Sequence, residues 1–276
     1  MIRRLLGPLF ALAAAAPLAA QGVLVAPTAV YIDHVRRSST ITLYNPNPDP
    51  AEVTISTAFG YPITDSLGHI TLRSVAQPDS TLPSAAAWIQ AFPRRMTIAP
   101  LERQTVRLLA TPPVGLKDGE YWARLIISAK GGKLAVTGMQ DTSAVQVALT
   151  MIVNTNIGMA YRKGPVTTGV TLSQLAARIV RDSLIVSSHL ERQGNAAFVG
   201  MVHGVLVDST GAVKAEFRGP IGVYYTMDPR YTTAVGPLPA GRYRLRFALT
   251  TDREDLDPRV VLKAAGARDS VDVRIP

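Results

Sequence analysis

Four histidines and one acidic cluster are the side chains with which this chain could bind a metal ion. The histidines stand far apart in the sequence, and none has a partner at the spacing of a metal motif. They are His34, His69, His189 and His203. The acidic cluster at positions 252–257 lacks the central glycine and the terminal glutamate of a calcium-binding loop. We therefore expect ordinary histidines and a solvated acidic loop, with no metal and no cofactor.

Catalytic motifs are equally scarce. The segment Asp208-Ser209-Thr210-Gly211 contains elements of an aspartic-protease signature, but it has no second copy in the chain. It lies between two alternating runs, where a hairpin requires a tight turn, and we interpret it as that turn. The chain has no cysteine, which excludes thiol catalysis, disulfides and zinc–thiolate sites. Since a phosphate loop and a nucleophile elbow are also missing, we predict that the protein is not an enzyme.

Basic residues outnumber acidic ones, which raises the question of an anionic partner. The formal net charge is +9, or +7 without the two arginines at positions 3 and 4. Arg242, Arg244 and Arg246 lie on one face of an alternating run, where they either meet an acidic partner or form the polar outer face of a sandwich. The other basic residues are scattered and are not interleaved with aromatic ones, so we expect no nucleic-acid partner.

The elements that position these residues are strands. Apolar and polar residues alternate with a period of two, which is typical of half-buried strands, and clusters rich in proline, glycine, asparagine and aspartate separate the runs. The clearest runs are 39–44, 53–56, 105–109, 121–127, 144–153, 183–187, 198–207, 211–217, 241–249 and 269–275. Only residues 172–180 have a possible helical rhythm. Strands at this spacing predict β-sandwiches.

The first 20 residues predict a secretory signal peptide. Two arginines precede an uncharged run from Leu5 to Ala20 that ends in small residues. That run is shorter than the roughly 20 apolar residues of a membrane-spanning helix, and no later segment could span a bilayer. We expect cleavage after Ala20 and no membrane insertion afterwards. The remaining length predicts two domains, at 21–163 and 164–276, after the signal peptide at 1–20.

An ordered set of short motifs runs through residues 23–165. In chain order they are Val25-Ala26-Pro27-Thr28-Ala29-Val30, Ser39-Thr40-Ile41-Thr42-Leu43-Tyr44-Asn45-Pro46, Trp88-Ile89, Ile98-Ala99-Pro100, Gln104-Thr105-Val106-Arg107-Leu108, Gly119-Glu120-Tyr121-Trp122-Ala123-Arg124-Leu125 and Met159-Ala160-Tyr161-Arg162. In this order and approximate spacing they resemble the periplasmic pilus-assembly chaperones of the chaperone–usher pathway. The resemblance implies an all-β fold, with two immunoglobulin-like β-sandwich domains in tandem.

The resemblance also implies a client. Members of this family bind a pilin-like subunit that lacks its last strand, in some cases together with an outer-membrane usher, and lend it a strand with alternating apolar residues. The longest alternation in this chain supplies five such residues, which would form the client-binding strand. They are Val145, Val147, Leu149, Met151 and Val153. A strand that faces its own core would show the same alternation, so both interpretations stay open.

One pair of positions departs from the family's pattern. The resemblance implies an arginine in the first strand and a lysine in the last strand of the first domain, which grip the client's terminal carboxylate. The motifs place Ala29 and Gly158 at these positions, and neither can bind a carboxylate through its side chain. Arg162 and Lys163 stand close by as possible anchors for the client.

Two functions are therefore considered. The first is a periplasmic chaperone that binds and delivers strand-incomplete pilus or surface subunits by lending its alternating strand. The alternative is a structural or adhesive cell-envelope protein made of two β-sandwiches, which the departure at Ala29 and Gly158 favours.

Overall fold

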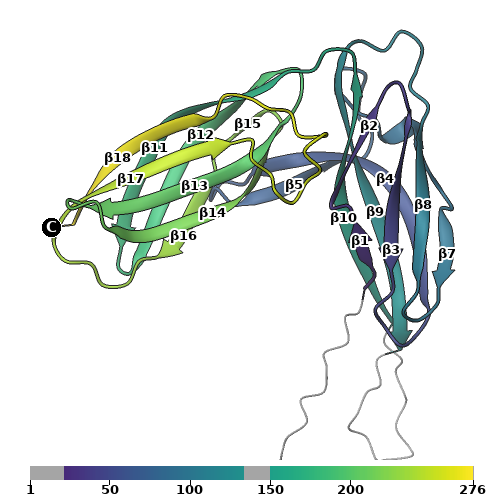
Figure 1. Ribbon diagram of the computed structural model, residues 1–276, viewed down its shortest axis with the longest axis horizontal. Coiled ribbons are helices and arrows are strands. Elements are labelled where there is room, and N and C mark those ends of the chain that lie inside the picture. The colour runs from purple at the N-terminus through teal and green to yellow at the C-terminus, as the bar shows by residue number, and fades with distance from the viewer. Residues whose placement is uncertain (1–21, 134–149, 276) are drawn as a thin grey trace, which may run out of the picture.

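The protein consists of two β-sandwiches that are joined at an angle (Figure 1). The computed structural model describes residues 22–133 and 150–275. The described elements are strands apart from one 3₁₀ turn, η1 (Ala86–Trp88), which confirms the predicted all-β fold with two sandwich domains. Within the described residues, no helix is long and apolar enough to cross a membrane.

The first sandwich has the strand pairing of an immunoglobulin-like domain. One sheet has the order β1-β3-β8-β6, and the other has the order β2-β10-β9-β4-β5, with β7 also paired to β4. The strands are β1 (Leu24–Ala26), β2 (Ala29–Asp33), β3 (Ser38–Tyr44), β4 (Ala51–Thr64), β5 (Ile70–Val75), β6 (Ile89–Phe92), β7 (Arg95–Ile98), β8 (Arg103–Ala110), β9 (Gly119–Lys133) and β10 (Thr150–Lys163). Alternate residues of these strands meet between the two sheets, as Leu43 and Leu108 do with no exposed surface.

The chain's first two strands lie in different sheets. β1 pairs antiparallel with β3, whereas β2 pairs parallel with β10 in the opposite sheet. Pro27 lies at the crossing, where a residue without an N–H group cannot continue a ladder of hydrogen bonds. β2, which begins after this proline, is five residues long and covers a small part of the 14-residue β10.

The second sandwich also has two sheets. Its strands are β11 (Thr168–Val180), β12 (Ser183–Gly194), β15 (Thr226–Met227) and β16 (Arg230–Ala234) in one sheet, and β14 (Val213–Val223), β13 (Phe198–Asp208), β17 (Gly241–Thr250) and β18 (Ala267–Ile275) in the other. Residues 172–180, which had the possible helical rhythm, lie in β11. An irregularity between Ser173 and Ala176, where Gln174 has a φ of 53°, shifts the alternation of that strand.

Aromatic residues fill the junction between the two sandwiches. Trp122 of β9 packs edge-on against Tyr224 and Tyr225, with ring centroids 4.7 and 5.4 Å apart. Tyr61 of β4 joins them, with its ring centroid 4.9 Å from that of Tyr225. The two sandwiches thus share a small apolar cluster at the bend of the molecule.

The β4–β5 hairpin forms a second connection. It extends from the first sandwich to the second, where the Asp228 amide donates a hydrogen bond to Thr64 Oγ1 over 2.9 Å. At its tip the Arg230 amide donates to the Gly68 carbonyl over 2.8 Å. The sequence alternation predicted only residues 53–56 of this hairpin, because β4 continues through a stretch that is buried on both faces.

Candidate functional site

Among the residues that the structure describes, one edge of β10 is open over about half its length. On one side β10 pairs with β9 from Thr150 to Lys163, and on the other side β2 pairs with it only from Gly158 to Arg162. Within residues 22–133 and 150–275, no strand pairs with the second edge from Thr150 to Ile157. Unpaired backbone N–H and C=O groups at such an edge can accept a further strand.

The core-facing side of β10 becomes exposed along this open half. Tyr161, Met159 and Ile157 point into the core and are 0 %, 2 % and 6 % exposed. Toward the other end of the strand, Val153 on the same side is half-buried and Met151 is 41 % exposed. Thr155 lies between Ile157 and Val153 on this side, and Ile152 on the opposite side is 59 % exposed, so apolar side chains of β10 extend beyond the core that covers its other half.

The predicted client-binding strand is placed only in part. Met151 and Val153 lie on the open half of β10, whereas Val145, Val147 and Leu149 lie outside the described residues. Val153 also approaches the start of the described chain, since a methyl group added at Gly22 would lie 3.0 Å from its Cγ1 atom. The role of these five residues stays a prediction.

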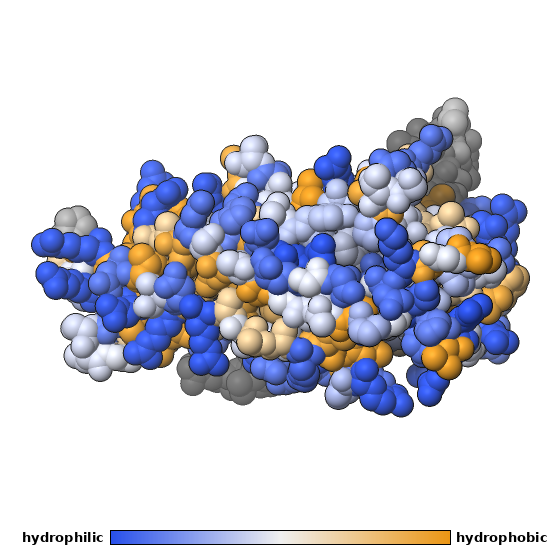
Figure 2. Space-filling model, turned by 90° about the horizontal axis from the view of Figure 1, so that it is seen from above, coloured by the Kyte–Doolittle hydropathy of each residue, from blue (hydrophilic) through white to orange (hydrophobic). Residues whose placement is uncertain are grey.

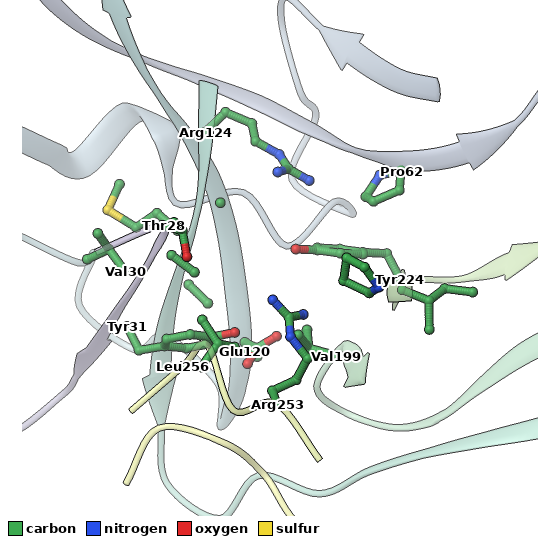
Figure 3. Close-up of a pocket in the computed structure, with 17 residues that line it drawn as sticks. Thr28, Val30, Tyr31, Pro62, Glu120, Arg124, Val199, Tyr224, Arg253 and Leu256 are labelled. Atoms are coloured by element: carbon green, nitrogen blue, oxygen red, sulfur yellow. The ribbon is translucent and has the colours of Figure 1, made fainter. Parts of the chain in front are cut away.

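The open edge leads to a cavity of about 210 Å³ between the two sandwiches (Figure 3). Ala29 and Gly158, the two positions that depart from the family's pattern, lie directly opposite each other in the β2–β10 ladder and line this cavity. Neither brings a charge to it. The cavity instead receives a guanidinium group from each sandwich, from Arg124 and from Arg253.

Arg124 of β9 brings a positive charge to the cavity, which Glu120, the partner of Arg162, also lines. It is opposite Gly158 in the ladder, and a methyl group added at that glycine would lie 3.4 Å from its Nη1 atom. Its Nε atom donates a hydrogen bond to the Gly60 carbonyl over 3.1 Å. Within the described chain, no carboxylate oxygen lies within 4.0 Å of its guanidinium group. The missing side chain at Gly158 leaves room for this cation.

The opposite wall of the cavity comes from the second sandwich. Arg253 makes a bidentate ion pair with Asp255, with both N–O distances at 2.7 Å, so its charge is largely balanced. The Tyr224 hydroxyl points toward the cavity between the two guanidinium groups (Figure 3). Burial raises the pKa of Tyr224, and the charge of Arg124 lowers it in part. This phenol therefore stays a neutral hydrogen-bond donor.

The two predicted anchors, Arg162 and Lys163, are engaged within the chain. Arg162 Nε lies 2.8 Å from Glu120 Oε2 in a pair that is nearly buried. Glu120 Oε1 also accepts hydrogen bonds from the Trp122 indole over 2.8 Å and from the Ala197 amide over 3.0 Å, so it joins the two sandwiches. Lys163 donates to the Leu116 carbonyl. Their assignment as client anchors stays a prediction, and these contacts make both weaker candidates than Arg124.

The other residues considered from the sequence lie in ordinary surroundings. Asp208 accepts hydrogen bonds from Thr210 and Ala212, which makes the expected turn between β13 and β14 and holds the pKa of its carboxyl far below the usual range. His69, His189 and His203 each contact one carboxylate. No group of three or more metal-binding side chains occurs among the residues that the structure describes.

Comparisons with known proteins give distant likenesses only. No protein-family model matches the sequence, and no curated protein matches it. The chain is similar to the CupB2 chaperone of Pseudomonas aeruginosa, over 91 % of this chain and 100 % of that one, with 12 % identity and a TM-score of 0.42. It is also similar to the E. coli chaperone DraB, over 81 % and 88 %, with 13 % identity and a TM-score of 0.41.

A third similar structure contains the Salmonella enterica SafA pilin in complex with the SafB chaperone. The likeness covers 91 % of this chain and 96 % of that one, with 11 % identity and a TM-score of 0.43. These likenesses are too distant to assign a family or a function, so both are inferred from the geometry of the site.

Proposed function

We propose that this protein is a periplasmic chaperone that binds strand-incomplete pilus or surface subunits along the open edge of β10. The observation that carries the proposal is the change along one side of this strand, from the buried Ile157 to the half-buried Val153 and the exposed Met151. Single exposed apolar residues are common on folded proteins, whereas neighbouring ones along an unpaired strand edge are typical of an interaction surface. A strand built only for its own core would be paired on both edges or protected at the open one.

A client strand would satisfy both features together. Its backbone would pair with the free N–H and C=O groups from Thr150 to Ile157, and its open groove would cover the apolar side chains of β10. Each apolar side chain buried in this way contributes about 1.5–3 kcal/mol. Met151 and Val153 are the two such side chains that the structure describes, and Val145, Val147 and Leu149 would add three more if the alternation continues.

The geometry also selects a direction for the client strand. β2 occupies the edge of β10 from Gly158 onward, so a strand added to the open edge must end beside that residue. This end is a C-terminus if the client runs parallel to β10, and an N-terminus if it runs antiparallel. Arg124 at this point favours a carboxylate, which supports the parallel arrangement with the client's terminal carboxylate in the cavity.

In this arrangement Arg124 would bind the client's carboxylate in place of the arginine and lysine that the resemblance implies at positions 29 and 158. Arg253 and the Tyr224 hydroxyl would complete the site from the second sandwich, which explains why the two sandwiches are held together beside it. The structural or adhesive alternative rested on the absence of a carboxylate site at Ala29 and Gly158. Because Arg124 of the neighbouring β9 can supply the positive charge, the absence of a basic side chain at these two positions no longer favours that alternative.

Isolation of complexes from the native periplasm tests the proposal. The tagged mature chain should co-purify with a secreted subunit whose own sandwich lacks a strand, and Met151→Glu should weaken this capture by about tenfold or more. Val213→Glu is the matched control, because Val213 is also an exposed apolar residue on a strand, at 59 % exposure, but lies in the second sandwich. Undiminished capture by Met151→Glu, or an equal loss in both variants, would contradict the role of β10.

A further inference from the structure

The outward side of β17 and β18 carries five arginines, which we call the arginine face. They are Arg242, Arg244, Arg246, Arg268 and Arg274. On β17 they alternate with the buried Tyr243, Leu245 and Phe247, so their direction is fixed by the core. The same side of these two strands has a single carboxylate, Asp272, which leaves a net charge of +4 from five arginines and one aspartate.

This charge is poorly balanced within the protein. Arg244 pairs with Asp272 over 2.8 Å, whereas no carboxylate of residues 22–133 or 150–275 lies within 4.0 Å of the other four guanidinium groups. Arg242 stands directly opposite Arg274 in the β17–β18 ladder. Like charges at directly opposite positions destabilise a sheet. A pair of this kind is most easily explained by a partner that supplies negative charge.

The chemistry of the arginine face distinguishes between partners. Its outward positions on β17 and β18 carry arginine, alanine, threonine, serine and aspartate, and the neighbouring β13 adds the half-buried Val205 beside Arg246, so no aromatic side chain and no exposed large apolar one lies among the arginines. Protein interfaces depend on such apolar and aromatic anchors at their centre. Guanidinium groups bind phosphate oxygens in a bidentate manner, and alternate residues of a strand present them about 7 Å apart. The face is therefore suited to an extended array of phosphates.

We propose that the arginine face binds the phosphate headgroups of anionic phospholipids and holds the protein at a membrane surface without insertion. If the protein is exported, as its first 20 residues predict, it meets such a surface in the envelope, which favours lipid over nucleic acid. β18 ends at the tip of the second sandwich, away from the open half of β10 (Figure 1). Figure 2 shows this tip covered mainly by hydrophilic side chains on the face in view. The inference is independent of the proposed chaperone function.

Sedimentation with lipid vesicles tests this proposal. The mature protein should bind vesicles of phosphatidylcholine with about one third phosphatidylglycerol, and not vesicles of phosphatidylcholine alone. Each arginine near an anionic surface contributes about fivefold to the partition coefficient, so Arg246→Gln with Arg268→Gln should weaken binding by about 25-fold. High salt should weaken it further, because the interaction is screened.

A control with the same net charge separates the arginine face from general attraction. Arg103→Gln with Arg107→Gln removes two exposed charges from β8 in the first sandwich and should change vesicle binding little. Equal loss in both double variants, or no binding of the unmodified protein to anionic vesicles, would overturn the proposal. So would tighter binding to an acidic polypeptide such as polyglutamate than to the vesicles. None of these outcomes depends on whether β10 binds a client.

Discussion

The most informative perturbation is the same substitution at two positions of β10. Met151 and Met159 are separated by an even number of positions on β10, with Met151 at an irregularity of the β9–β10 register, and they are 41 % and 2 % exposed. Glutamate at position 159 would bury a charge without a partner, at a cost of about 4 kcal/mol, which is comparable with the stability of a domain. Glutamate at position 151 can stay hydrated, so we expect a loss below about 1 kcal/mol.

These values predict different thermal behaviour. At about 3 °C for each kcal/mol, Met159→Glu should lower the melting temperature by more than about 10 °C and Met151→Glu by less than about 3 °C. The affinity for the client should change in the opposite order, because Met151→Glu should weaken binding more than Met159→Glu does. Loss of one filled pocket at position 151 removes about 1.5–3 kcal/mol, which corresponds to a weakening of about 10- to 150-fold.

The measurement is a melt followed by circular dichroism, beside a titration of each folded variant with the client identified by co-purification. Met151→Glu should melt like the unmodified protein and bind its client poorly. If Met151→Glu melts as early as Met159→Glu, the open half of β10 belongs to the core, and the lent strand is refuted. If it melts normally and binds normally, position 151 takes no part in binding.

Three further predictions concern the cavity, the second core and export. Arg124→Gln should melt normally and weaken client binding by about tenfold. Amidation of the client's C-terminus should weaken its binding to the unmodified protein by the same factor but should not change its binding to the variant. If the two losses add, Arg124 does not contact the client's carboxylate. Tyr231 has a buried hydroxyl for which the described residues offer no partner, so Tyr231→Phe should raise the free energy of unfolding by up to about 1 kcal/mol at neutral pH. Burial raises the pKa of Tyr231 above its usual value of 10, so the folded protein loses stability as the pH rises above 10. Above pH 10 the melting temperature should therefore fall less steeply with pH in Tyr231→Phe than in the unmodified protein. N-terminal sequencing of the protein from an osmotic-shock fraction should begin at Gln21, and an intact Met1 in a membrane pellet would contradict the predicted signal peptide.

The sequence alone was sufficient for the fold class and for many of the longer strands, such as β3, β8, β9, β12, β13, β14, β17 and β18. Leu43 and Leu108 lie in the predicted runs 39–44 and 105–109, and both are fully buried. The turn at Asp208 and the alternation of Arg242, Arg244 and Arg246 could also be predicted, because each depends on residues that are neighbours in sequence. Local rules failed at the β4–β5 hairpin, where β4 is buried on both faces and loses its alternation.

The candidate site depended on partners that are distant in sequence. Alternation along β10 is the same whether the strand faces its own core or a client, and only the short β2 shows which part of its edge is open. The charges of the cavity could not be assigned for a similar reason. Arg162 seemed available in the sequence but is paired with Glu120, 42 positions away, whereas Arg124 reaches the cavity past Gly158 from the neighbouring strand.

This division has a physical cause. The direction of a side chain on a strand follows from the two-residue repeat of the backbone, so the sequence by itself determined which residues of each strand face a core. Whether a strand edge is paired, or whether a cation has a counter-charge, depends on which strands the fold brings alongside. Only the tertiary structure, which begins β2 at Ala29 opposite Gly158 and turns the second sandwich toward Arg124, decided where the edge is open and which charge lies at its end.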